Sequence, residues 1–283
     1  MFPIEEKGLK MEKLAILDEL FNLEQKIALV TGGGSGIGKM ISEVLAFTGA
    51  KVYITSRKLE VIENACEAIN AKNPKHSVEF FEGDLSSEDG IQRLINNFKK
   101  KEEHLDILIN NSGVSWGANL GEFPYHAWER VMKVNVAGLF HLTQSLLPFL
   151  SSNATMEDPS RIINIGSVMG TAALGDGPYS YSASKAAVHQ ITRILAKELA
   201  EKKITVNALA PGPFLSRMTQ FAVGEKENEK RVSKNVPIGR IGKPNDIKSS
   251  ILYLCGSGGS YVTGAVLPID GGIHVATGPE IFE

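Results

Sequence analysis

The sequence has 283 residues, of which 43% are hydrophobic and 22% are charged, and these proportions are typical of a soluble globular protein. The net charge of −2 at pH 7 gives no indication of binding to nucleic acids or acidic membranes. The two cysteines, Cys66 and Cys255, lie far apart, so no disulfide framework or cysteine metal site is predicted, and a reducing, cytoplasmic location is favoured.

The first 22 residues differ in pattern from the remainder of the chain. They mix acidic residues with lysines, contain no arginine and have no secretory hydrophobic region, which argues against a signal or transit peptide. No apolar run anywhere in the sequence approaches the roughly 18 residues that a membrane span needs. We expect residues 1–22 to be an extension, partly helical over 11–21, and residues 23–283 to form the domain.

Short apolar runs alternate with helical patterns along the rest of the chain. Strands are expected at residues 26–33, 51–55, 77–84, 105–111, 161–167, 204–212 and 264–270. Helices are expected at residues 37–48, 59–72, 90–100, in a stretch ending near 150, and at 182–202 and 245–255. Strands that alternate with helices indicate crossover units and a parallel sheet. The sequence therefore predicts an α/β, Rossmann-like, doubly wound fold with a seven-stranded parallel sheet in a single domain.

The segment TGGGSGIGKM lies between the first predicted strand and the first predicted helix. The pyrophosphate of a dinucleotide binds at such a helix N-terminus, and glycines let the backbone approach it. A triphosphate-binding loop is disfavoured, because Met40 stands where a hydroxyl for Mg²⁺ is needed. A turn without a ligand is the alternative, since the strict G-x-G-x-x-G spacing is absent. The candidate cofactor-binding residues of this turn are Gly32, Gly34, Ser35, Gly36, Ile37 and Gly38.

The end of the second predicted strand is expected to select the cofactor. An acid about 20 residues beyond the glycines binds the ribose hydroxyl of NAD, whereas a cation suits the 2′-phosphate of NADP. The sequence has Ser56 and Arg57 there and no acid. This favours NADP (NADPH), the alternative being that Arg57 and Lys58 cover a solvated edge.

The segment PYSYSASKAA contains two tyrosines, and helix geometry separates their roles. In a helix that turns about 100° per residue, Tyr181 and Lys185 lie about 40° apart on one face. Tyr179 lies about 240° from Lys185, and because it follows Pro178 we expect it to precede the helix. A nearby cation lowers the pKa of a tyrosine, so Tyr181 is predicted to transfer a proton. Taken alone, this spacing also fits an ordinary surface pair.

Further polar residues end predicted strands at the same edge of the sheet. Asn111, Ser167 and Pro211 each follow a strand, and ligands of open α/β sheets bind at the carboxyl ends of strands. We therefore expect them to converge with Tyr181 and the glycine turn in one crevice. None of the six histidines has metal-ligand spacing, and His189 is interpreted as a helix-face residue.

Together these features resemble the short-chain dehydrogenase/reductase family. The matching motifs in chain order are TGGGSGIG, GDLSS with Asp84, NNSG, VNVAG with Asn135, GSVMG with Ser167, YSASK and APG. The resemblance covers about residues 24–273, and the combination of motifs is far more specific than any single one.

The resemblance implies a tetrad of Asn135, Ser167, Tyr181 and Lys185. Tyr181 would protonate the substrate oxygen and Ser167 would polarise the carbonyl. Lys185 would lower the tyrosine pKa and bind the nicotinamide ribose, and Asn135 would hold a water of the proton relay. Residues 214–237 would form a mobile substrate lid. The implied cofactor contacts beyond the glycine turn are Ser56, Arg57, Asp84, Leu85, Asn111, Gly113, Tyr181, Lys185, Pro211, Gly212 and Ser216.

The chain departs from the family pattern at three places. Ser112 replaces the usual alanine of NNSG, the interval between Ser167 and Tyr181 is one residue longer than the commonest spacing, and Ser216 replaces a threonine. None of these changes removes a catalytic group.

The loops look like the 3-oxoacyl reductase branch, and within it like the bacterial reductases of rhamnolipid synthesis. This implies NADPH-dependent reduction of a 3-oxoacyl thioester or related β-keto compound. The alternatives are a dehydrogenase of sugar acids or polyols and, from another class, a non-catalytic NADPH-binding regulatory protein. The resemblance also implies a homotetramer, with interfaces from the helices near 125–150 and 180–201 and from the last strand.

Overall fold

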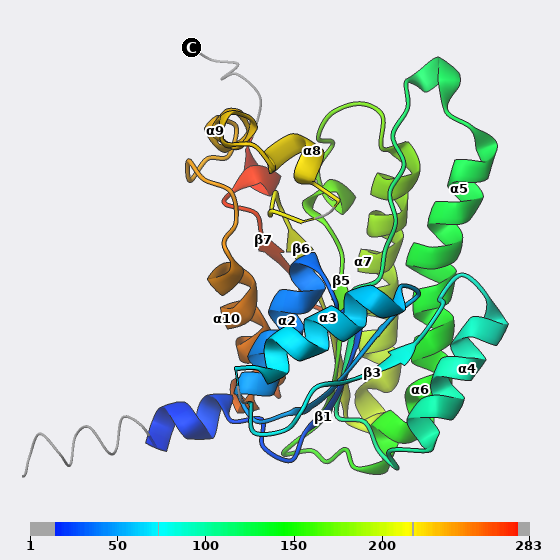
Figure 1. The fold of residues 1–283 in the computed structure, drawn as a ribbon, viewed down its shortest axis with the longest axis vertical. Coiled ribbons are helices and arrows are strands. Elements are labelled where there is room, and N and C mark those ends of the chain that lie inside the picture. Colours follow the sequence, from blue (N-terminus) through cyan, green and yellow to red (C-terminus); the bar gives the residue numbers. More distant parts are fainter. Residues whose placement is uncertain (1–14, 73, 217, 277–283) are drawn as a thin grey trace, which may run out of the picture.

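A computed structural model describes residues 15–72, 74–216 and 218–276, and its centre is a parallel sheet of seven strands (Figure 1). The strand order β3-β2-β1-β4-β5-β6-β7 confirms the doubly wound fold that the sequence predicts. The order reverses beside β1, and ligands of such folds bind at the carboxyl ends of the strands at this point. The strands are β1 (Ile27–Thr31), β2 (Lys51–Ser56), β3 (Glu79–Glu82), β4 (Ile107–Asn110), β5 (Ser160–Ile165), β6 (Ile204–Pro211) and β7 (Val266–Ile269).

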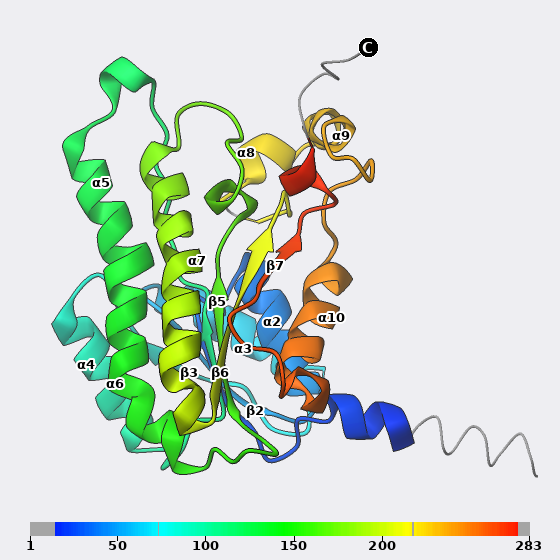
Figure 2. The same cartoon turned by 180° about the vertical axis from the view of Figure 1, so that it is seen from behind.

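Helices cover both faces of the sheet. The helices α2 (Gly36–Phe47), α3 (Leu59–Asn70) and α10 (Pro244–Cys255) pack on one face (Figure 1). The helices α4 (Glu88–Lys99), α6 (Leu139–Ser152) and α7 (Tyr179–Leu199) pack on the other (Figure 2). The remaining helices and turns are α5 (Tyr125–Met132), α8 (Gln220–Val223), α9 (Lys226–Lys234), η1 (Leu120–Glu122), η2 (Lys133–Gly138), η3 (Val168–Gly170), η4 (Ala200–Lys202), η5 (Ser257–Gly259) and η6 (Ile273–Val275).

Alternate strand residues face two hydrophobic cores. In β1, Ala28 and Val30 belong to the core beneath α2, α3 and α10, whereas Ile27 and Leu29 belong to the core beneath α4, α6 and α7. A strand that is buried on both faces reads as a continuous apolar run, which is why these strands are recognisable in the sequence. Between residues 15 and 276, leaving aside 73 and 217, no helix is long and apolar enough to cross a membrane.

Two helices differ from the sequence expectation. The long helical stretch that ends near residue 150 is interrupted by η2, a π-helical segment between α5 and α6. The helix α7 begins at Tyr179, directly after Pro178, so the expectation that Tyr179 precedes the helix is wrong. Proline is readily accommodated at a helix start because the first helical N–H groups have no partner within the helix.

The described part of the N-terminal extension is helical over residues 15–21 and lies at the amino end of the sheet (Figure 1, dark blue). The Ser257 hydroxyl donates a hydrogen bond to the Glu19 carbonyl at 3.0 Å, and Leu23 is buried. The expected helix is thus confirmed over 15–21, while its first residues, 11–14, lie outside the described residues. This helix lies at the opposite end of the sheet from the crevice.

Candidate active site

The predicted site residues converge at the carboxyl edge of the sheet. A side-chain carbon placed on Gly113, just after β4, would lie 3.4 Å from the Asn135 Oδ1 and 3.6 Å from the Lys185 Nζ. A carbon placed on Gly36 would lie 3.0 Å from the Ser216 Cβ. The glycine turn therefore lies beside the segment after β6, and the end of β4 lies beside Asn135 and Lys185 of the predicted tetrad.

The glycine turn between β1 and α2 has the backbone of a phosphate cradle. Gly32 and Gly36 have positive φ angles of 64° and 51°, which favour glycine. A side-chain carbon on Gly38 would lie 2.2 Å from the Gly32 carbonyl oxygen, so α2 can approach β1 this closely only with glycine there. Ser35 forms no side-chain cap on α2, which leaves the first N–H groups of the helix without that partner.

Asn111 binds the protein itself and holds β4 against the glycine turn. Its Nδ2 donates to the carbonyl oxygens of Thr31 at 2.9 Å and Gly32 at 3.2 Å. The Thr31 hydroxyl in turn accepts from the backbone N–H groups of Asn111 and Ser112, both at 2.9 Å. The Asn111 side chain therefore supports the turn, and its contact with the cofactor stays a prediction.

The predicted ribose end of the crevice lies at the ends of β2 and β3. The Arg57 Nε is 3.9 Å from the Asp84 Oδ1, and both side chains are partly exposed. Burial acts to raise the pKa of Asp84, but hydrogen bonds from Ser86 and the charge of Arg57 outweigh it and hold the pKa below its usual value. The strand ends in Ser56 without an acid, so the half-exposed Arg57 guanidinium is available for an anionic group.

Tyr181, Lys185 and Ser167 form a polar cluster in which Lys185 and Ser167 are buried and Tyr181 is half-buried. The Lys185 Nζ lies 5.6 Å from the centre of the Tyr181 ring and donates a hydrogen bond to the Ile165 carbonyl at 2.6 Å. Burial raises the pKa of Tyr181, and a hydrogen bond with Ser167 acts in the opposite direction. Burial lowers the pKa of Lys185 to about 8. Desolvation thus dominates both groups, a balance that sequence spacing does not reveal.

Tyr179 points away from this cluster, as helix geometry predicts. Its ring lies edge-on to Phe123 at 5.6 Å between ring centres. It borders a separate cavity of about 650 Å³, which Trp128 and Leu174 also line. The choice between the two tyrosines made from the sequence therefore agrees with their surroundings.

Asn135 lies in the π-helical segment η2 and is buried. Its Oδ1 accepts from the Val114 N–H at 2.8 Å, and its Nδ2 donates to the Val114 carbonyl and the Ser184 hydroxyl, both at 2.9 Å. These bonds tie the segment after β4 to α7. Sequence reasoning missed Ser184, whose position directly before Lys185 on the same helix is the signal that could have identified it.

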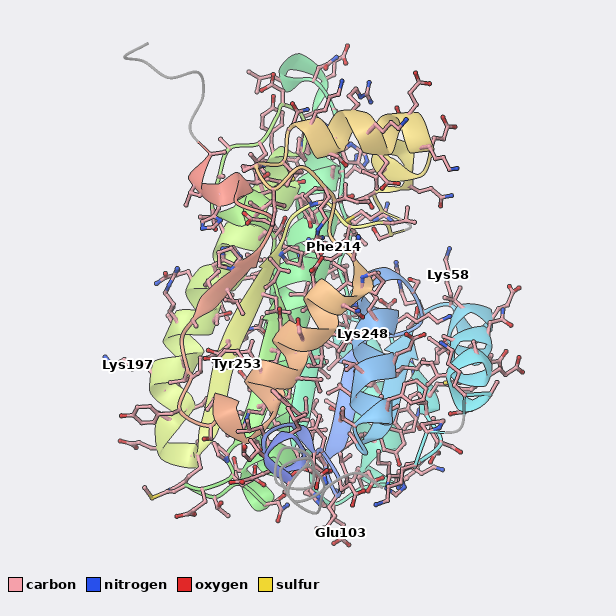
Figure 3. The ribbon with its side chains drawn as sticks, turned by 90° about the vertical axis from the view of Figure 1, so that its left-hand side faces the viewer. Lys58, Glu103, Lys197, Phe214, Lys248 and Tyr253 are labelled. Atoms are coloured by element: carbon pink, nitrogen blue, oxygen red, sulfur yellow. The ribbon has the colours of Figure 1, made fainter. Side chains whose placement is uncertain are left out.

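The segment after β6 is bonded to the end of β7. The Gly212 N–H donates to the Ile269 carbonyl at 3.0 Å, and a side-chain carbon on Gly212 would lie 2.8 Å from the Asp270 Cα. Phe214, near the top of β6 in Figure 3, is buried and forms an isolated bridge with Gly242. Pro211, the last residue of β6, is buried as well. This support fixes the start of the predicted lid.

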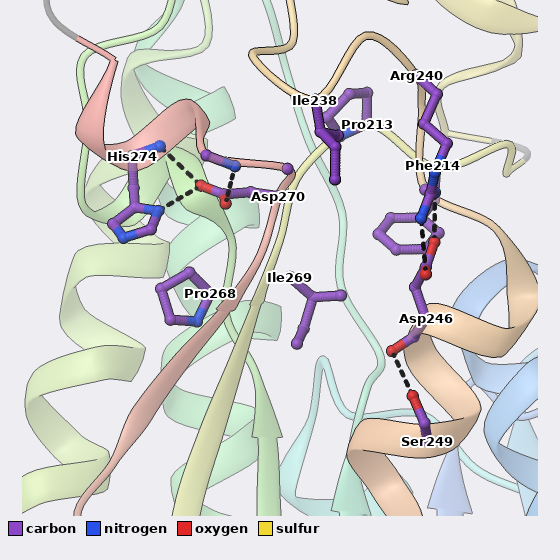
Figure 4. A pocket seen from close by; sticks show the side chains of 13 residues that line it. Pro213, Phe214, Ile238, Arg240, Asp246, Ser249, Pro268, Ile269, Asp270 and His274 are labelled. Carbon is purple, nitrogen blue, oxygen red and sulfur yellow. Dashed lines mark hydrogen bonds and ion pairs between the residues drawn. The ribbon is translucent and has the colours of Figure 1, made fainter.

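A cavity of about 410 Å³ lies behind this segment (Figure 4). An ion pair and a histidine–aspartate contact border it, with Arg240 bonding Asp246 at 2.6 and 3.0 Å and the His274 Nδ1 lying 2.9 Å from the Asp270 Oδ2 (Figure 4). The predicted lid contains α8 and α9 and lies between two held residues, Phe214, which bridges to Gly242, and Arg240, which bonds to Asp246.

The chain is similar to known oxidoreductases over most of its length. Residues 32–274 match a family described as Enoyl-(Acyl carrier protein) reductase. The chain is 44% identical over 255 residues to the rhamnolipids biosynthesis 3-oxoacyl-[acyl-carrier-protein] reductase of Pseudomonas aeruginosa, covering 90% of this chain and 98% of that protein. It is 35% identical over 256 residues to a 3-oxoacyl-[acyl-carrier-protein] reductase of Thermotoga maritima, covering 89% and 99% of the two chains.

The chain is also similar to solved structures of oxidoreductases over most of its length. The Pseudomonas aeruginosa RhlG/NADP active-site complex superposes with a TM-score of 0.87 at 44% identity, covering 90% of this chain and 99% of that one. A gluconate 5-dehydrogenase from Burkholderia cenocepacia, in complex with NADP and tartrate, superposes with a TM-score of 0.83 at 27% identity, covering 92% and 100% of the two chains.

Proposed function

Since the chain belongs to the short-chain dehydrogenase/reductase family, we propose that it is an NADPH-dependent reductase of 3-oxoacyl thioesters or related β-keto compounds. The observation that carries this proposal is the cluster of half-buried Tyr181 with buried Ser167 and Lys185 beside Gly113. It lies at the sheet edge where a nicotinamide ring and a ketone would meet. The names of the two 3-oxoacyl reductases support the substrate class.

The residues at this edge of the sheet have the chemistry that NADPH needs. The α2 N-terminus and its glycines suit the pyrophosphate, and Arg57 with Ser56 suits the 2′-phosphate. Asp84 and Leu85 would contact the adenine, Lys185 and Tyr181 the nicotinamide ribose, and the segment of Pro211, Gly212 and Ser216 the nicotinamide amide. When bound, the cofactor supplies the hydride.

The side chains of this protein manage the proton and the oxygen. Burial keeps Tyr181 protonated near neutral pH, so its hydroxyl can donate a proton to the carbonyl oxygen of the substrate. The Ser167 hydroxyl, which donates to Tyr181 in this structure, would turn its single O–H to the same oxygen when the substrate is bound. Lys185 favours the tyrosinate that remains, and Asn135 holds a water through which the proton is replaced.

NADPH oxidation with acetoacetyl-CoA tests the proposed function directly. We expect turnover with NADPH to exceed turnover with NADH. The loss of the cofactor absorbance measures both rates. Faster oxidation of sugar acids or polyols than reduction of acetoacetyl-CoA would favour the dehydrogenase alternative, which the gluconate 5-dehydrogenase structure represents. NADPH binding without turnover of any ketone would favour the non-catalytic regulatory alternative.

Replacing Arg57 by serine is expected to raise KM for NADPH about tenfold to hundredfold, because a hydrogen bond to a charged group contributes about 1.5–3 kcal/mol. The KM for NADH, which lacks the 2′-phosphate, is expected to stay unchanged. Steady-state kinetics with both cofactors measure this difference.

The matched control for this prediction is Lys58→Ser. Lys58 is exposed beside Arg57, at the start of α3, and extends outward in Figure 3. Equal effects of the two substitutions on NADPH would show that Arg57 only covers a solvated edge.

The resemblance supports a homotetramer as the assembled form. Large apolar side chains are exposed on the helices expected at one interface, including Tyr125 on α5, Phe140 on α6 and Ile194 on α7. Tyr261, before β7, is fully exposed near the other expected interface. Sedimentation velocity of the purified protein decides between a monomer, a dimer and a tetramer.

A further inference from the structure

Ser167 lies one residue beyond the last backbone N–H of this segment that bonds to the sheet. The Gly166 N–H still donates to the Leu209 carbonyl of β6 at 2.8 Å. The next N–H, that of buried Ser167, instead donates to the Nε2 of His189 on α7 at 3.4 Å. A buried N–H requires a partner, and this imidazole supplies it.

The His189 ring fills a space that two glycines leave open. A side-chain carbon on Gly166 would lie 2.2 Å from the His189 Nε2, and one on Gly170 would lie 2.9 Å from its Cε1. These glycines flank Ser167 in the IGSVMG segment, so the turn wraps around the ring. The ring is 3% exposed. Its position and the position of the turn are therefore mutually fixed.

The same face of α7 carries three polar side chains at intervals of four residues. Tyr181, Lys185 and His189 follow one another along this face. Lys185 bonds to the Ile165 carbonyl at 2.6 Å, and His189 accepts from the Ser167 N–H at 3.4 Å. The helix that presents Tyr181 is thus bonded to the end of β5 on both sides of Gly166.

The surroundings of His189 keep its imidazole neutral. Burial lowers its pKa to about 4, and the positive charges of Arg193 and Lys185 act in the same direction. A neutral ring accepts a hydrogen bond at one nitrogen and donates at the other. Because Nε2 accepts from Ser167, Nδ1 carries the hydrogen and faces the Thr171 hydroxyl at 3.5 Å.

We propose that His189 is a positioning residue that sets the place of the Ser167 hydroxyl relative to Tyr181 by holding the Ser167 backbone and filling its turn. This inference rests on the proposed function, in which Ser167 bonds to the carbonyl oxygen of the substrate. His189 itself touches neither the substrate nor the cofactor in this role. The proposal assigns a use to a buried histidine that the sequence pattern presents as an ordinary helix residue.

The first test compares His189→Leu with a matched control, Thr192→Val. Thr192 is also buried on α7 and joins the helix to β5, but its hydroxyl bonds to Asn164, at 2.9 Å, and to the Val188 carbonyl rather than to the Ser167 turn. We expect His189→Leu to lower kcat about tenfold to hundredfold, the range for a catalytic group displaced by up to about 1 Å. The KM for NADPH is expected to stay unchanged, and Thr192→Val to retain the parent kcat.

Two amide substitutions provide a rescue test and cover the case in which His189→Leu does not fold. The amide of a glutamine extends to the position of Nε2, whereas the shorter asparagine ends near Nδ1. We expect His189→Gln to recover most of the kcat and His189→Asn to recover little of it. Equal kcat values for the glutamine and asparagine variants would overturn the proposal, since they would show that an acceptor at Nε2 has no effect.

A double substitution separates this inference from the proposed function. If His189 acts through Ser167, then His189→Leu will lower kcat little further in a Ser167→Ala background. Equal fold losses in the two backgrounds would overturn the positioning role while leaving the proposed function intact. A Ser167→Ala variant with the parent kcat would instead contradict the proposed role of Ser167, on which the inference depends.

Discussion

Replacing Tyr181 by phenylalanine is expected to lower kcat by about two to four orders of magnitude, the usual range for losing general acid catalysis. The substitution removes one hydroxyl and leaves the ring beside Lys185. Burial raises the pKa of this tyrosine, so the protonated form that donates to the carbonyl oxygen is the form present at neutral pH. The measurement is the rate of NADPH oxidation with acetoacetyl-CoA, together with NADPH binding by fluorescence.

The neighbouring substitution Tyr179→Phe is the control for this result. It removes the same hydroxyl two residues earlier on α7, from a ring that packs against Phe123 on the far side of the helix. We expect this variant to retain the parent kcat and the parent affinity for NADPH. A large loss in Tyr179→Phe with little change in Tyr181→Phe would reverse the assignment of the proton donor.

The second large effect is expected from Lys185→Met. This substitution should abolish most turnover but change the free energy of unfolding at pH 7 little, although Lys185 is buried. The pKa of Lys185 is lowered from 10.5 to about 8 by burial, which corresponds to about 3 kcal/mol of unfavourable free energy for the charged form. Methionine removes that cost but leaves the Ile165 carbonyl without its donor, at a cost of about 1–3 kcal/mol. These effects nearly cancel at pH 7.

The pH dependence of unfolding tests this explanation. Between pH 8 and 10.5 the unfolded chain retains a proton on Lys185 that the folded chain has released. Stability rises with pH wherever the unfolded state binds more protons, so Lys185 makes the parent gain stability across this range. Lys185→Met lacks this gain, and denaturant unfolding at pH 7 and pH 10 measures the difference.

The control for this prediction is Lys197→Met, on an exposed position of the same helix (Figure 3). We expect this variant to retain the parent kcat and the parent pH dependence of stability. If Lys185→Met and Lys197→Met show the same pH dependence of stability, the pKa of Lys185 is not lowered in the folded protein.

The fold was predictable because the apolar strand runs and the helix-length segments between them alternate regularly along the chain. Runs such as IALVT in β1 are apolar on both faces, and the segments between the runs are long enough for crossover helices. The π-helical segment η2 was not predictable, because KVNVAG has the apolar spacing of the regular helices on either side. A single additional residue in a helix leaves no mark in such a pattern.

The candidate site was predictable to the extent that spacing determines it. The interval of four residues placed Tyr181 beside Lys185, and strand ends placed Ser167 near both. The expectation that Lys185 governs the pKa of Tyr181 did not anticipate the effect of burial, which depends on loops remote in sequence. The partnership of His189 with Ser167 was also missed, because spacing along α7 does not tell which buried backbone group a side chain meets.

The π-helical segment also constrains how the length of this protein can change during evolution. Removing one residue from 133–138 would let α5 and α6 join as a regular α-helix, the more stable form, and would rotate Asn135 by about 100° away from Val114 and Ser184. Such a deletion would stabilise the helix but break the hydrogen bonds that hold Asn135 in the candidate site. Gaps between this chain and its active relatives should therefore fall in connecting loops and spare this segment, even where residue identities differ.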